Sequence, residues 1–99
     1  MRIITWNCNG KFREKYSEIA KLNADIYVIQ ECENPLKYPK HNYASFAINH
    51  LWIGSNENKG LGIFAKEGID MEINNWENYC LRNFLSVCIN KSFCSFLNY

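Results

Sequence analysis

Two apolar runs separated by one amphipathic segment most constrain the fold of this chain. Arg2–Trp6 and Ile26–Gln30 are rich in β-branched and aromatic residues, as buried strands are. From Phe12 onward, apolar residues recur at helical spacing with charged residues on the other faces, and we expect this helix to end near Asn23. A strand, a helix and a strand within about thirty residues predict a βαβ unit with a right-handed crossover and two parallel strands.

The second half of the chain follows a strand pattern with tight connections. Ala44–Ile48 and Leu51–Ile53 are candidate short strands, and the polar tract before Leu61–Ala65 favours a hairpin. Three further runs are candidate strands: Gly68–Ile73, Leu81–Ile89 and Phe93–Leu97. The sequence therefore predicts an α/β domain with a mixed, mostly antiparallel sheet and one main helix.

The composition agrees with one small folded domain. The 99 residues are 47% hydrophobic, which is enough for a modest core, and the net charge of +1 indicates neither a polybasic arm nor an acidic tail. No apolar stretch approaches the roughly 20 residues needed to cross a bilayer, and the start lacks an apolar signal-peptide segment. We therefore expect a cytoplasmic protein that does not enter membranes. The five cysteines form no C-x-x-C pair, so we expect reduced, buried thiols.

Polar side chains follow each of the two predicted parallel strands. Asn7 and Asn9 lie where the first strand ends, in a turn that includes Gly10, and Glu31 follows the second strand. Because the carboxyl ends of parallel strands meet at the same edge of a sheet, we expect these side chains to lie close together. Oxygen ligands of this kind suit Mg²⁺, which takes one or two carboxylates and keeps several waters. A site of this composition implies hydrolysis of a phosphate ester.

Simpler roles fit the same residues. Asn9-Gly10 would form the turn after any strand, and Glu31 could be the first solvated residue beyond one. Lys11 and Arg13 follow the turn and are candidates for contact with a phosphate, but they also fit a solvated helix start. Trp52 is a candidate for stacking on a base or sugar, or else a core or rim tryptophan.

Three motifs in order resemble the endonuclease/exonuclease/phosphatase superfamily, in particular its exonuclease III-like members. Residues 5–10 (TWNCNG) and 29–31 (IQE) are similar to its first two motifs, and residues 60–66 (GLGIFAK) are similar to its following glycine-rich strand. The resemblance implies a four-layer α/β sandwich, and we interpret residues 1–99 as its truncated N-terminal half. It implies that another sheet packs on the inner face of the first, with most of that sheet beyond Tyr99.

The resemblance also implies roles for single residues. By position, Glu31 and Asn9 match ligands of Mg²⁺ or Mn²⁺, and Asn7 matches the asparagine that organises the catalytic centre. The family completes its site with an Asp-x-Asn motif and an Asp-His pair, and this sequence has neither. Its two histidines, His41 and His50, do not follow an aspartate, so we assign no general base.

The first functional hypothesis is a metal-dependent, nuclease-like phosphodiester hydrolase that is weakly active or inactive as this chain. Its substrate would be a nucleic acid or another phosphate ester. One alternative is a non-catalytic remnant or interaction module that associates through an exposed apolar face. Another alternative is a phosphatase of the same superfamily.

Overall fold

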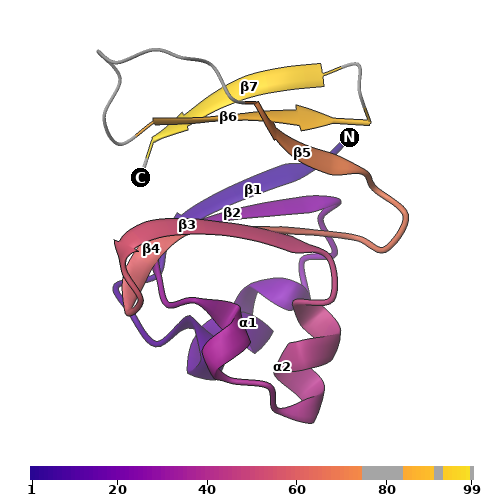
Figure 1. Cartoon of the computed structure of the whole chain (residues 1–99). Coiled ribbons are helices and arrows are strands. Elements are labelled where there is room, and N and C mark those ends of the chain that lie inside the picture. Colours follow the sequence, from indigo (N-terminus) through magenta and orange to yellow (C-terminus); the bar gives the residue numbers. More distant parts are fainter. Residues whose placement is uncertain (75–83, 91–92, 99) are drawn as a thin grey trace.

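Two β-sheets and one layer of helices form the computed structural model, which describes residues 1–74, 84–90 and 93–98 (Figure 1). The first sheet is mixed and has the order β1 (Ile3–Asn7), β2 (Ile26–Cys32), β4 (Lys59–Ala65), β3 (His50–Asn56). The second is antiparallel and has the order β5 (Met71–Asn74), β6 (Phe84–Ile89), β7 (Phe93–Asn98). The helices are α1 (Phe12–Ala20), the short 3₁₀ helix η1 (Pro35–Lys37) and α2 (His41–Phe46). Both α-helices lie on the side of the first sheet that faces away from the second sheet.

The predicted βαβ unit is present. Strands β1 and β2 pair in parallel, with Ile3 opposite Ile26 and Asn7 opposite Gln30. The connecting helix ends close to the expected position, because Asn23 takes a left-handed backbone conformation (φ 51°) that a helix does not continue through. The α/β class and the mixed sheet expected from the sequence are therefore confirmed.

The first sheet separates two hydrophobic cores. On the helical side, the buried ring of Phe12 lies 5.1 Å from the ring of Phe64 and 6.1 Å from that of Tyr43, measured between centroids. On the other side, a second cluster joins the first sheet to β6; its buried members are Ile26, Val28, Leu61, Ile63, Ala65 and Ile89. Because strands of this same chain cover the middle of the inner face, these residues do not form the exposed apolar patch that we expected.

The segment Ala44–Ile48, which we expected to be a strand, lies largely in helix α2 instead. Tyr43 and Ala47 are one helical turn apart and are both buried in the helical-side core, and the partly buried Phe46 packs against the same core. Apolar residues spaced by three and four positions face one side of a helix, whereas in a strand they would be divided between two faces. Contact with the sheet thus decides in favour of the helix.

The remaining predicted strands are present with shifted ends. The β3–β4 hairpin is confirmed, with Ile53 opposite Leu61. Strand β5 begins at Met71 rather than at Gly68, because Gly68 occupies a turn with a φ of +94°. Strand β6 covers the second part of the predicted strand Leu81–Ile89, and residues 81–83 lie outside the described residues.

The cysteines differ in their oxidation state. Cys8 and Cys32 are buried free thiols, as expected, and burial is the main cause that raises the pKa of each. Both thiols therefore stay protonated and behave as small apolar groups. Cys88 is disulfide-bonded, which corrects the expectation that all five thiols are reduced.

Phe12 should be a side chain on which the stability of the helical-side core depends strongly. Its exposed fraction is 0%, and its ring contacts aromatic rings from β4 and α2. We expect Phe12→Ala to lower the free energy of unfolding by about 3–5 kcal/mol, through lost burial and the cavity left behind. Urea denaturation followed by circular dichroism measures this change. Ile48→Ala is the control, because Ile48 is 67% exposed and should change stability by less than about 0.5 kcal/mol.

Candidate functional site

The carboxyl ends of β1 and β2 are held together by backbone hydrogen bonds that continue past the first strand. The Cys8 N–H donates to the Gln30 carbonyl (3.3 Å), and the Gly10 N–H donates to the Glu31 carbonyl (3.1 Å). Between them, Asn9 adopts a left-handed conformation with a φ of 58°. The loop after β1 is therefore fixed against Glu31, as the sequence pattern predicts.

Glu31 occupies an irregular position in β2. Its φ is 52°, and the register between β2 and β4 shifts around it. A left-handed conformation at a residue other than glycine costs on the order of 1–3 kcal/mol, and such positions are frequent at functional sites. The side-chain hydrogen bond from Asn7 is the main cause that lowers the pKa of Glu31, and Lys59 lowers it further. The Glu31 carboxylate is therefore ionised at neutral pH.

Lys59 forms an ion pair with Glu31 that the sequence pattern did not single out. Its Nζ lies 3.2 Å from Glu31 Oε1. Lys59 is the first residue of β4, and only the antiparallel pairing of β4 with β2 brings it beside Glu31. The two residues are 28 positions apart, so no local spacing could have indicated this contact.

Asn7 links the loop that follows β1 to Glu31 in β2. Its side chain bonds to the Glu31 carboxylate, and its Oδ1 accepts a hydrogen bond from the backbone N–H of Asn9 (3.1 Å). The side chain of Asn9 is exposed beside it. The structure thus places the side chain of Asn7 where it lowers the pKa of Glu31, and it places Asn9 next to Asn7 through its backbone.

The donor atoms at this edge fit a hard cation held by few protein ligands. Mg²⁺ commonly binds through one or two carboxylates and keeps several of its waters. Glu31 supplies one carboxylate, and Asn9 supplies an exposed amide oxygen nearby. Among the residues that the structure describes, no three His, Cys, Asp or Glu side chains are grouped so that they could hold a metal. This end of the sheet therefore offers one carboxylate and one neighbouring amide as oxygen donors, which is fewer than a closed structural metal site needs.

Lys11 and Arg13 stand at the start of α1 in different surroundings. Lys11 is exposed and left-handed (φ 54°) directly before the helix. The guanidinium of Arg13 lies 3.7 Å from Glu33 and 3.6 Å from Glu14, and it stacks on the Tyr38 ring at 4.1 Å. The charge of Arg13 is thus largely compensated within the protein, so Lys11 is the more accessible of the two for a phosphate.

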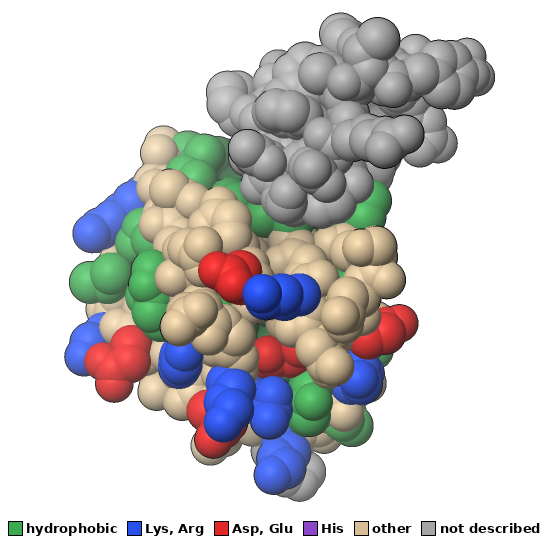
Figure 2. Space-filling view, turned by 90° about the vertical axis from the view of Figure 1, so that its left-hand side faces the viewer, with side chains coloured by type: hydrophobic (Ala, Val, Ile, Leu, Met, Phe, Trp, Pro, Cys, Tyr) green, Lys and Arg blue, Asp and Glu red, His purple; other side chains and the backbone are tan. Residues whose placement is uncertain are grey.

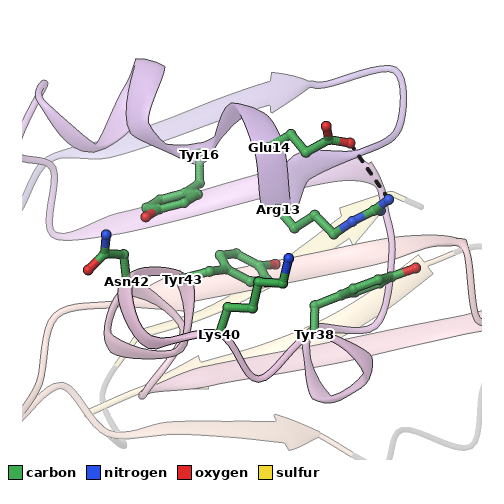
Figure 3. A pocket seen from close by; sticks show the side chains of 7 residues that line it. All are labelled: Arg13, Glu14, Tyr16, Tyr38, Lys40, Asn42 and Tyr43. Carbon is green, nitrogen blue, oxygen red and sulfur yellow. Dashed lines mark ion pairs between the residues drawn. The ribbon is translucent and has the colours of Figure 1, made fainter.

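Arg13 belongs to the wall of a cavity of about 500 Å³ on the helical side of the sheet (Figure 3). The lining residues are Arg13, Glu14, Tyr16, Tyr38, Lys40, Asn42 and Tyr43. Figure 3 shows Arg13 extending from α1 toward Tyr38, with its ion pair to Glu14 drawn as a dashed line. Arg13 therefore contacts Glu14 and Tyr38 of this wall as well as Glu33, while the carboxylate of Glu31 interacts with Asn7 and Lys59.

The side chains of Trp52 and His50 are bonded to backbone carbonyls, which indicates structural roles. The indole N–H of Trp52 donates to the Cys32 carbonyl (2.8 Å), and its ring covers Gly60, where a Cβ atom would come within 2.5 Å of the ring. His50 Nδ1 lies 2.6 Å from the Ala47 carbonyl. Trp52 thus fits the rim role that we considered, and His50 is bonded to the segment that follows α2.

Two charged residues that sequence reasoning missed hold α1 against this edge. Glu33 is 2% exposed, and its two carboxylate oxygens accept hydrogen bonds from the backbone N–H groups of Phe12 (3.1 Å) and Arg13 (2.8 Å). Lys15 donates from Nζ to the Cys8 carbonyl (2.7 Å). The sequence has no capping residue directly before Phe12, and the first N–H groups of a helix need acceptors. This lack was the signal that an acceptor such as Glu33 had to come from elsewhere in the chain.

Charges of both signs are distributed over the side of the molecule on which the β3–β4 hairpin lies (Figure 2). Figure 2 views the side on which the β3–β4 hairpin lies in Figure 1, and acidic and basic side chains are interspersed across it. With a net charge of +1, contact with a nucleic acid here would depend on local interactions more than on a strong positive field. In the part of the chain that the structure describes, no helix has the length and hydrophobicity needed to span a bilayer.

Comparisons with known proteins support a nuclease-like fold. No protein-family model matches the chain, and no relative is found among curated proteins. The solved structure of a 3'-5' exonuclease (NExo) from Neisseria meningitidis is similar, with a TM-score of 0.58 and 17% sequence identity over 100% of this chain. The match covers 41% of the exonuclease chain, so this chain spans about two fifths of its length. At this identity the similarity shows a common fold.

Replacing Glu33 should loosen the start of α1. Glu33→Gln removes the charge and one of two acceptors from a buried position, and we expect it to lower the free energy of unfolding by about 1–3 kcal/mol. Urea denaturation measures the loss. Glu14→Gln is the matched control, because Glu14 pairs with the same arginine but is 60% exposed, and it should change stability by less than about 0.5 kcal/mol. Equal effects of the two changes would contradict the capping role.

The pKa of Glu31 should report its two partners separately. We expect the pKa of Glu31, followed at its carboxyl carbon by NMR, to lie below the ordinary value of a glutamate, to rise in Asn7→Ala, and to rise less in Lys59→Met. A pKa lowered by folding contributes stability above the unfolded pKa, and this contribution is lost as the pH falls through the folded value. A larger effect of Lys59→Met than of Asn7→Ala would show that the ion pair, and not the amide, dominates.

Proposed function

We propose that this chain is the N-terminal part of a metal-dependent phosphodiester hydrolase of the endonuclease/exonuclease/phosphatase superfamily. The observation that carries the proposal is the Glu31 carboxylate, ionised and held by Asn7 where the parallel strands of a nuclease-like fold end. Mg²⁺ or Mn²⁺ as the metal, nucleic acid as the substrate and the cytoplasm as the compartment are parts of this proposal.

In this proposal each residue at the edge has a separate task. Glu31 binds the metal, Asn9 adds an amide oxygen, and Asn7 orients the carboxylate through its hydrogen bond. A divalent metal supplies polarisation of a phosphoryl oxygen and neutralises charge in the transition state. The exposed Lys11 on the adjoining loop contacts a phosphate of the substrate.

Among the residues that the structure describes, none at this end of the sheet is placed to carry out the proton transfer of the reaction. His50 is engaged by the Ala47 carbonyl on the helical side. The thiols of Cys8 and Cys32 stay protonated because burial raises their pKa values. We therefore expect the 99-residue chain to bind metal weakly and to have little or no hydrolytic activity.

A non-catalytic module is the second candidate function, and the ion pair of Lys59 with Glu31 favours it. This contact neutralises the carboxylate within the chain and so stabilises the edge without a metal. A module of this kind would keep the fold and the Asn7–Glu31 contact while binding no divalent cation.

Metal binding and DNA nicking test the two functions together. Free Mn²⁺, measured by electron paramagnetic resonance, should decrease when the chain is added, and this decrease should be lost in Glu31→Gln and kept in Glu18→Gln. Nicking of supercoiled plasmid with Mg²⁺ should be slow or undetectable. Equal Mn²⁺ binding by the wild type and Glu31→Gln would overturn the metal role of Glu31, and an absence of Mn²⁺ binding would favour the module. Rapid nicking that depends on Glu31 would overturn our expectation of low activity.

A further inference from the structure

We propose that Lys59 is a built-in counter-cation of Glu31 that occupies the metal-binding side of the carboxylate and sets the metal affinity of this edge. This inference rests on the proposed function, because it assigns a regulatory role to a neighbour of the same carboxylate. Lys59 Nζ lies 3.2 Å from Glu31 Oε1, which is the distance of a hydrogen-bonded ion pair. An ammonium group and a divalent cation that use the same carboxylate oxygen compete for it.

The backbone of Lys59 is held in place while its side chain is free to leave. At the hairpin tip, Asn34 bonds to Glu57 through its backbone N–H (2.8 Å, to the carbonyl) and through its side-chain amide (2.8 Å, to Oε2). Lys37 Nζ donates to Asn58 Oδ1 (3.2 Å). These contacts fix the hairpin against the segment that follows β2. The side chain of Lys59 is 65% exposed, so it can rotate into solvent without a change of fold.

The interaction of the Glu31 carboxylate with Asn7 does not compete with a metal in the same way. Asn7 approaches the carboxylate with its amide, and its own Oδ1 is engaged by the backbone N–H of Asn9. Asn7 therefore orients Glu31 both when Lys59 is bound and when it is displaced. An exposed ion pair exchanges readily, so the position of the ammonium group should depend on the concentration of divalent cation.

A matched ion pair lies at the opposite end of the same two strands. Lys66, directly after β4, places Nζ 3.4 Å from Oδ1 of Asp25, directly before β2. The two carboxylates are exposed to the same degree (32% and 31%), while Lys66 is 47% exposed and Lys59 is 65% exposed. Asp25 is also bonded to the backbone N–H of Arg2 (2.7 Å), so it has a structural role. Lys66 is therefore the control for removing a lysine from an ion pair of this sheet.

Mn²⁺ titration of the full chain at constant ionic strength tests the inference. We expect Lys59→Met to bind Mn²⁺ about three- to tenfold more tightly than the wild type, because a positive charge next to the ion is removed. Lys59→Glu, which adds a second carboxylate, should bind more tightly still. Lys66→Met should bind as the wild type does. Circular dichroism verifies that each variant is folded.

Each outcome of this titration either supports or overturns the proposed role of Lys59. Tighter binding in Lys59→Met that disappears when Glu31→Gln is added supports the inference, as does binding by Lys59→Met where the wild type binds none. Equal affinities of Lys59→Met and the wild type, together with weaker binding by Glu31→Gln, overturn the inference and leave the metal role of Glu31 intact. Absence of binding in every variant overturns the metal role of Glu31 and the inference with it.

Discussion

The arrangement of the whole candidate site depends on the backbone hydrogen bonds between the loop after β1 and the end of β2. Because Gly10 bonds to the carbonyl of Glu31, the loop and the irregular end of β2 form one unit. The left-handed conformation of Glu31 lets its side chain meet Asn7 and Lys59, while the buried Glu33 two residues later caps α1. The irregular end of β2 thus sets both the position of the exposed Glu31 carboxylate and the position of Glu33, which caps α1.

Rigid support for this end of the sheet comes from the burial of the central strands β2 and β4 on both faces of the first sheet. Aromatic rings fill the space under α1 and α2, and aliphatic side chains fill the space under the second sheet. A sheet that is covered on both sides is held rigidly, since cores are close-packed. The exposed charges of Lys59 and Glu31 are therefore the parts that can rearrange, as the role proposed for Lys59 requires.

Sequence reasoning recovered the fold better than it recovered the site. The βαβ unit and the β3–β4 hairpin were predictable because their signals are periodic and local. It went wrong at Ala44–Ile48, where short apolar runs fit a helix and a strand equally well and packing decides between them. Glu33 was missed because its hydrogen-bond partners, Phe12 and Arg13, are about twenty residues away in the sequence. The disulfide at Cys88 was missed because spacing alone does not pair cysteines.

By itself the sequence determined that Asn7 and Glu31 would end neighbouring parallel strands, because alternation, helical period and turn residues act over a few positions. Only the tertiary structure decided what surrounds that carboxylate. The antiparallel pairing of β4 with β2 places Lys59 beside Glu31. Glu33, which would be taken for a surface residue from the sequence, is buried beneath α1 and caps it. Electrostatic contacts of this kind follow distance in space, and distance in space is set by the packing of the whole chain.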